Sequence, residues 1–164
     1  DNFQANYRLG TLNITLQNMD LAYKYLTHAM KLDNKNPRVP YQIGILLLSQ
    51  GKFRESLEYL SIARNLQFKS ASLYLYTGLC HESLGNLQES KKYYEMALKL
   101  DPNDGTITSS LERINKKIET EKTHGYIPAI RKNQNEDELG ESIPIPINKS
   151  AFEIRLSDDE ASDE

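Results

Sequence analysis

The chain has 164 residues, which is the size of roughly one domain. Its apolar content of 38% is below the about 45–50% of typical globular chains, so part of the chain is expected to lie outside a core. A formal net charge of −3 argues against a basic nucleic-acid-binding stripe, and the longest apolar run, residues 45–48, is far shorter than a membrane span of roughly 20 residues. The single cysteine, Cys80, leaves no internal disulfide and suits a reducing compartment, so we expect an intracellular protein, cytoplasmic or nuclear.

The charge is unevenly distributed along the chain. Residues 124–164 contain four Lys or Arg and ten Asp or Glu, whereas the preceding residues contain sixteen basic and thirteen acidic side chains. The chain therefore divides into a mildly basic body and an acidic tail. Because residue 1 is Asp rather than Met and no apolar leader follows it, we expect a fragment or a processed product in which no targeting signal can be observed.

A repeat of 34 residues organises the body. Four kinds of residue recur twice at this interval: Gly10, Gly44 and Gly78; Ala29, Ala63 and Ala97; Leu32, Leu66 and Leu100; Tyr25, Tyr59 and Tyr93. Such a period is the sequence signature of a repeat architecture. It predicts three units, residues 3–36, 37–70 and 71–104.

Each unit is predicted to form two helices, because its apolar residues recur at intervals of three and four. The turn between the helices contains Gly51 in the second unit and Gly85 in the third, where glycine permits a positive φ. In the first unit we expect Asn18, which follows Gln17, to replace the glycine. The second helices are expected to end near Leu32 and Leu100.

The period and its residues resemble the tetratricopeptide repeat family over about 102 of the 164 residues. The pattern consists of Leu9-Gly10, Ala22 and Ala29; Ile43-Gly44, Gly51 and Ala63; and Tyr74, Gly78, Gly85, Tyr94, Ala97 and Pro102. The resemblance implies an all-α fold, a right-handed α-solenoid of antiparallel helix pairs. The chain departs from the family pattern at four positions: Ser56 and Ser90 replace a small alanine, Phe68 replaces a proline, and Pro40 lies early in a first helix.

A seventh helix is expected from about Thr106 to Lys122, within a capping region of residues 105–122. Its apolar stripe comprises Ile107, Leu111, Ile114 and Ile118, and we expect Ser110, Glu112, Arg113, Lys116, Lys117 and Glu119 to point away from it. The ends of a solenoid need a helix with one polar outer face, and this helix matches that need; a dimerisation helix is the alternative. Since no comparable cap precedes Phe3, further repeats are expected upstream.

The resemblance also assigns a peptide-binding groove to the first helix of each unit. The matching positions are Tyr7, Arg8, Thr11, Tyr41, Gln42, Ile45, Leu75, Tyr76 and Leu79. Because this set is aromatic and apolar with one cation, its natural ligand is an extended or helical peptide with apolar anchors. The alternative is that the same side chains pack against another subunit or an adjoining segment of this chain.

Chaperone-binding members of the family hold a C-terminal carboxylate with lysine, arginine and asparagine side chains. The matching positions here are Tyr7, Thr11, Gln42, Ser72 and Tyr76. None of them is a lysine or an arginine, so binding of chaperone C-termini through these units is not expected.

The tail, residues 123–164, is expected to be largely disordered or extended, because its composition cannot bury enough apolar surface to offset the entropy of ordering. Two apolar segments, residues 126–130 and 143–147, could dock in the groove or on a partner, or remain solvated. Ser157 precedes Asp158-Asp159-Glu160 and resembles an acidic-directed kinase site, so it is a candidate phosphorylation site.

No catalytic or metal-binding motif stands out in the sequence. His28, His81 and His124 lie in different regions, and Cys80 shares a helix position with Leu12 and Leu46, which indicates a core thiol. The sequence therefore predicts a non-catalytic scaffold without a cofactor, which binds protein partners and neither nucleic acid nor membrane, within a multi-subunit assembly. The alternatives are the repeat region of a larger enzyme and a structural homo-oligomer.

Overall fold

The computed structural model describes residues 2–123 of the chain. Within this range the secondary structure consists of α-helices, and no strand is present. The helices are α1 (Phe3–Thr15), α2 (Met19–Leu32), α3 (Arg38–Ser49), α4 (Phe53–Asn65), α5 (Ala71–Ser83), α6 (Leu87–Leu100) and α7 (Gly105–Thr123). The predictions for the acidic tail, its two apolar segments and Ser157 lie outside the described residues.

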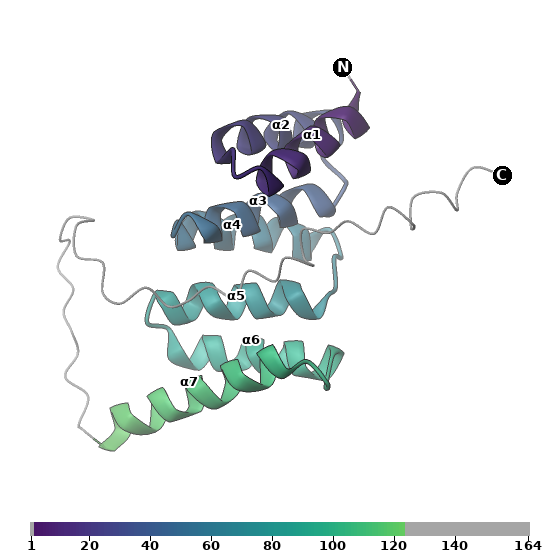
Figure 1. Ribbon diagram of the computed structural model, residues 1–164. Coiled ribbons are helices and arrows are strands. Elements are labelled where there is room, and N and C mark those ends of the chain that lie inside the picture. The colour runs from purple at the N-terminus through teal and green to yellow at the C-terminus, as the bar shows by residue number, and fades with distance from the viewer. Residues whose placement is uncertain (1, 124–164) are drawn as a thin grey trace.

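The helices form three antiparallel pairs that stack in chain order, with α7 added to the last pair (Figure 1). The tightest packing is within the pairs α1–α2, α3–α4 and α5–α6, and each pair then contacts the next through α2–α3 and α4–α5. Helix α7 packs against α6. The predicted all-α fold of stacked helix pairs is thus confirmed.

The recurring glycines allow the two helices of a pair to approach closely. A Cβ atom built on Gly10 would lie 2.6 Å from the Leu26 side chain, and one built on Gly44 would lie 2.7 Å from that of Leu60. Such distances leave no room for a methyl group, so glycine at this position sets the spacing within each pair.

The turns within the pairs follow the predicted glycines in two of the three units. Gly51 and Gly85 have φ angles of 73° and 78°, in the left-handed region that glycine adopts without strain. In the first unit the prediction for Asn18 was wrong: Gln17 has φ 61°, whereas Asn18 has φ −85°. The physical reason is register, because residue 17 lies 34 positions before Gly51 and must make the same turn.

The core follows the repeat. Ala29, Ala63 and Ala97 are fully buried, as are Ser56 and Ser90, so these serines do pack as small residues. Two clusters of buried side chains fill the stack, one around α1 to α3 and one from α3 to α7.

Helix α7 begins and ends within one residue of its predicted bounds. Its side-chain cap is Asp104, whose Oδ1 accepts hydrogen bonds from the backbone N–H groups of Thr106 at 2.7 Å and Ile107 at 3.3 Å. Ile107, Ile114 and Ile118 are buried, which confirms the predicted apolar stripe.

Candidate functional site

The nine side chains of the predicted groove lie on the first helix of each pair. We call this set the first-helix face: Tyr7, Arg8 and Thr11 on α1; Tyr41, Gln42 and Ile45 on α3; Leu75, Tyr76 and Leu79 on α5. Helices α1, α3 and α5 follow one another along the stack (Figure 1). The fold therefore brings the nine positions to successive first helices.

Burial divides the first-helix face into two parts. Arg8 is exposed and Tyr7 is half-buried, whereas the other seven side chains are buried. Leu75 and Leu79, which are 6% and 2% exposed, belong to the same core cluster as Ile107 of α7. The α5 end of the first-helix face therefore packs in the core that includes α7. The accessible side chains of the first-helix face are those on α1. Binding by these nine residues stays a prediction.

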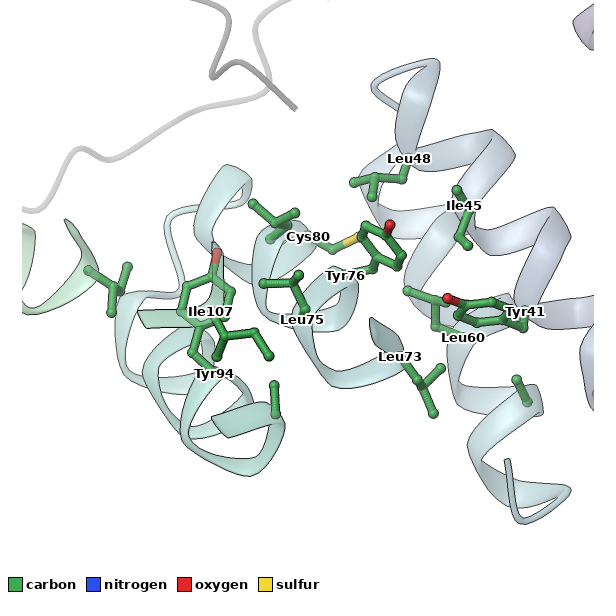
Figure 2. Close-up of a cluster of buried hydrophobic side chains, with 14 of the residues drawn as sticks. Tyr41, Ile45, Leu48, Leu60, Leu73, Leu75, Tyr76, Cys80, Tyr94 and Ile107 are labelled. Atoms are coloured by element: carbon green, nitrogen blue, oxygen red, sulfur yellow. The ribbon is translucent and has the colours of Figure 1, made fainter. Parts of the chain in front are cut away.

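An aromatic cluster joins the second and third units. The ring of Tyr41 lies 4.7 Å from that of Phe68 and 6.4 Å from that of Tyr76, between centroids. Figure 2 shows Tyr41 on α3 and Tyr76 on α5 within the buried cluster. Burial raises the pKa of Tyr76 to about 12, and burial together with the Tyr76 hydroxyl also raises the pKa of Tyr41, so both phenols stay neutral. Phe68 was not among the predicted site residues, although its departure from the family's proline was the signal that could have identified it.

Gln42, in the middle of the face, carries an unsatisfied acceptor. Its side-chain oxygen Oε1 is buried, and among the described residues no donor forms a hydrogen bond with it. A buried polar atom left in this state costs about 1–3 kcal/mol. The side chain itself is 5% exposed, next in sequence to the aromatic Tyr41.

A buried carboxylate anchors α7, and sequence reasoning missed it. The side chain of Glu82 has no exposed surface, and it accepts hydrogen bonds from the Tyr94 hydroxyl at 2.6 Å, from Arg113 at 2.9 Å through two nitrogens and from Lys117 Nζ at 2.9 Å. Burial alone would raise the pKa of Glu82, but the bonds from Arg113, Tyr94 and Lys117 outweigh it and lower the pKa to about 2.

The expectation that Ser110, Arg113 and Lys117 point away from the packed side of α7 was therefore wrong, since Ser110 is also buried. The side chains of Arg113 and Lys117 reach back from α7 to α5 because the Glu82 carboxylate is buried there and requires partners. A signal was present in the sequence, since Glu82 stands where the other units have the apolar Ile14 and Leu48. The group of four side chains has a structural role, which is to hold the last helix.

The second-helix side of the stack has a small cavity between α4, α5 and α6. Its volume is about 180 Å³, and it is lined by Leu57, Leu60, Ser61, Arg64, Thr77, His81 and Tyr93. His81 stacks on Tyr93 with ring centroids 5.3 Å apart, and Arg64 donates a hydrogen bond to the Tyr93 hydroxyl at 2.7 Å. Sites for small molecules usually enclose about 300–1,000 Å³, so this cavity is too small to be the principal site.

Cys80 is fully buried, which confirms the predicted core thiol. Its Sγ donates a hydrogen bond to the Ser56 hydroxyl at 3.3 Å, and burial raises the thiol pKa to about 11. Between residues 2 and 123, no three His, Cys, Asp or Glu side chains lie close enough together to hold a metal ion. In the same range, no helix combines the length and the apolar character that crossing a membrane requires.

Two family models match the chain, and both describe the tetratricopeptide repeat. One covers residues 3–36 and the other residues 41–105. No curated protein sequence matches the chain significantly.

Solved structures share the fold. The first repeat domain of Spaghetti (RPAP3), described as bound to the HSP90 peptide SRMEEVD, is 25% identical with a TM-score of 0.69 and covers 71% of this chain and 93% of its own. The OM64 repeat domain from Arabidopsis is 22% identical with a TM-score of 0.67, covering 70% of this chain and 95% of its own. The Sgt2 repeat domain from Aspergillus fumigatus is 18% identical with a TM-score of 0.67, covering 85% and 91%.

Proposed function

Because the chain belongs to the tetratricopeptide repeat family, we propose that it is a protein–protein interaction scaffold that binds a segment of a partner protein on the first-helix face. The related Spaghetti (RPAP3) domain is described as bound to a peptide of HSP90, which supports this class of ligand. The proposal assigns no catalytic step to residues 2–123 and places the chain within a multi-subunit assembly.

The observation that carries the proposal is the unsatisfied oxygen of Gln42. A peptide in extended conformation presents backbone N–H groups along its length, and one of them can donate to this Oε1 after the Gln42 side chain rotates toward the ligand, because the oxygen is buried in the free chain. Binding would then remove the cost of about 1–3 kcal/mol that the free protein bears. Gln42 also occupies the position of an asparagine that holds the peptide in chaperone-binding relatives, so it retains a side-chain amide at this point.

The ligand predicted by these side chains differs from an acidic C-terminus. At the other positions that hold the carboxylate in chaperone-binding relatives, this chain has Tyr7, Thr11, Ser72 and Tyr76. None of these positions offers a cation to a terminal carboxylate. Arg8, which is exposed on α1, can pair with one acidic side chain of the ligand. We therefore expect an internal segment with apolar anchors and one acidic residue, bound mainly by the first and second units.

The test compares Gln42→Met with Gln50→Met. Phage display against the whole chain selects peptides, and titration calorimetry measures their affinities for each variant. Methionine keeps the length of glutamine and removes the acceptor, so Gln42→Met should weaken binding about tenfold without lowering the melting temperature. Gln50 is exposed at the end of α3, and its substitution should change neither quantity. Equal affinity for Gln42→Met and the wild type would reject the first-helix face as the site.

A further inference from the structure

The cavity between α4, α5 and α6 combines an apolar lining with hydrogen-bonding side chains. The three helices are neighbours in the stack (Figure 1), and the cavity of about 180 Å³ has room for one side chain of a ligand. Leu57 and Leu60 supply apolar lining, and Arg64, His81 and Tyr93 supply polar groups. We call these five residues the α4–α6 pocket. None of them belongs to the first-helix face, so the pocket is independent of the proposed function.

The equivalent place between the first and second units is apolar. Met30 and Leu47 stand there, 34 residues before Arg64 and His81, and both pack in a cluster of hydrophobic side chains. Leu47 is 1% exposed. The repeat thus supplies an internal reference: apolar side chains at these two positions are sufficient to stack two units, and the cation and the imidazole of the α4–α6 pocket are not needed for packing.

Arg64 and Tyr93 offer hydrogen-bond donors to the pocket without a matching acceptor. Arg64 Nη1 donates to the Tyr93 hydroxyl at 2.7 Å, and among residues 2–123 no carboxylate forms an ion pair with Arg64. The other N–H groups of the guanidinium are therefore open to a ligand. Since the Tyr93 oxygen accepts the bond from Arg64, its own proton points elsewhere and can be donated as well.

His81 adds a third donor. Its ring stacks on that of Tyr93 with centroids 5.3 Å apart, and burial lowers the pKa of His81, so the imidazole is neutral at pH 7 and carries one N–H. Nδ1 is buried and has no hydrogen-bond partner in the described part of the chain, which leaves Nε2 as the nitrogen that can serve a ligand. The negative charge of Glu89 opposes the lowering of this pKa, but Glu89 is exposed and pairs with Lys92 at 3.6 Å.

Three donors beside an apolar lining match a carboxylate on a short side chain. An ionised carboxylate only accepts hydrogen bonds, through two oxygens, and its bonds with a guanidinium are among the strongest in proteins. The methylene groups of an aspartate or glutamate would at the same time contact Leu57 and Leu60. The chemistry of the pocket therefore selects an acidic side chain.

The chain itself contains a dense run of such side chains. Residues 157–164 contain five acidic residues and no basic one, whereas residues 1–123 contain sixteen basic and thirteen acidic residues. Ser157 lies 34 positions after Thr123, which permits a span of up to about 110 Å, whereas α7 with its 19 residues is about 29 Å long. A tethered ligand also has a high effective concentration. Charge and connectivity therefore favour this run over an acidic segment of another protein.

We propose that the α4–α6 pocket binds a carboxylate side chain of the chain's own acidic run, residues 157–164. Arg64 is the main partner of the carboxylate, and the Tyr93 hydroxyl and His81 Nε2 donate the further hydrogen bonds. The contact closes the polar junction between the second and third units with an acceptor that residues 2–123 do not supply.

Paramagnetic relaxation in the whole chain, observed by NMR, tests for this contact. A nitroxide label is attached to the cysteine of Ala161→Cys, within the acidic run. Cys80 is buried and its thiol pKa is about 11, so it stays unlabelled. The label should broaden the backbone amide signals of Arg64 and Tyr93 and leave those of α1 unchanged.

A titration then measures the affinity of the pocket. The whole chain carries Asp158→Asn, Asp159→Asn and Glu160→Gln, so that its own run no longer competes, and a synthetic peptide of residues 155–164 is added. The signals of Arg64 and Tyr93 should shift with the peptide concentration and give its Kd.

Arg64→Met makes the assignment specific, with Arg54→Met as the matched control. Both substitutions remove one exposed cation from α4. Arg64→Met should raise the Kd of the peptide at least about tenfold, whereas Arg54→Met should change it by less than about twofold. His81→Leu should raise it about threefold. Because Arg64→Met and His81→Leu introduce the residues that the preceding unit has at these positions, neither should lower the melting temperature.

Four results would overturn the proposal. The first is a labelled chain in which the signals of Arg64 and Tyr93 are not broadened. The second is an unchanged Kd with Arg64→Met, and the third is an equal rise with Arg54→Met, which would show a general attraction of charges. The fourth is binding of the added peptide at the pocket without any contact by the chain's own run, which would assign the pocket to an acidic segment of a partner.

Discussion

Replacement of Glu82 by glutamine is expected to release α7 from the stack. In the wild type, Oε1 accepts from Arg113 Nε and Lys117 Nζ, and Oε2 accepts from Arg113 Nη2 and the Tyr94 hydroxyl. Glutamine has nearly the same volume, but its amide NH2 group is a donor and takes the place of one carboxylate oxygen. This NH2 group would then face the donor groups of Arg113, Lys117 or Tyr94. It also leaves the two cations without the negative charge that compensates them.

The magnitude follows from the pKa of Glu82. A decrease from about 4.5 to about 2 corresponds to about 3 kcal/mol at 1.36 kcal/mol per unit. Removal of one partner of a buried ion pair costs about 3–5 kcal/mol. The side chains of Arg113 and Lys117 are 37% and 42% exposed, so water compensates part of the loss. We therefore expect Glu82→Gln to cost about 2–3 kcal/mol, concentrated in α7.

Hydrogen exchange of the whole chain measures this locally. A loss of about 2–3 kcal/mol corresponds to exchange about 30- to 150-fold faster in α7, while α1, at the other end of the stack, should be unaffected. The control is Glu89→Gln, because Glu89 forms an exposed pair with Lys92 at 3.6 Å that is worth less than about 0.5 kcal/mol. Unchanged exchange in α7, or equal acceleration in α1 and α7, would refute the reasoning.

The same group predicts a dependence of stability on pH. A carboxyl group whose pKa is lowered by folding stabilises the protein above its unfolded-state pKa of about 4.5, and this contribution disappears as the pH falls towards about 2. The wild-type melting temperature should therefore fall more steeply than that of Glu82→Gln between pH 4.5 and 2. Parallel curves would show that the charge of Glu82 contributes nothing.

Three further predictions concern packing and turns. Gly44→Ala should cost about 1–3 kcal/mol in urea unfolding, because its Cβ would lie 2.7 Å from Leu60, whereas Gly105→Ala, with nothing within 4 Å, should cost nothing. Gln17→Gly should stabilise by about 1 kcal/mol by relieving φ 61°; a lower urea midpoint would contradict this. Cys80, whose pKa is about 11, should react with Ellman's reagent at pH 8 only after unfolding; rapid labelling of the folded chain would show an accessible thiol.

The sequence determined most of the fold because the decisive features are local and repeated. The period of 34 residues placed Gly44 against the second helix of its own pair, and the apolar spacing of Ile107, Ile114 and Ile118 predicted α7 nearly to the residue. The wrong prediction for the first turn rested on residue type, because asparagine adopts a positive φ more readily than glutamine. The 34-residue period instead places Gln17 at the position of Gly51, and the structure follows the period.

The candidate site was less predictable, because it depends on contacts between units. The nine positions of the first-helix face could be assigned from the family pattern, but no local pattern reveals that Leu75 and Leu79 share a buried cluster with α7. The partners of Glu82 are 31 and 35 residues away in the sequence. Their pairing depends on the packing of α7 against α6, which brings Arg113 and Lys117 to the Glu82 carboxylate on α5.

The two ends of the described stack differ in the side chains that they expose. At the α7 end, the Glu82 carboxylate is bound within the stack, and charged side chains such as Lys116 face outward. At the other end, Leu9 and Leu12 are exposed at positions that are buried in the next unit. Addition of a helix pair would bury apolar area at the α1 end, whereas at the α7 end it would first have to desolvate charges.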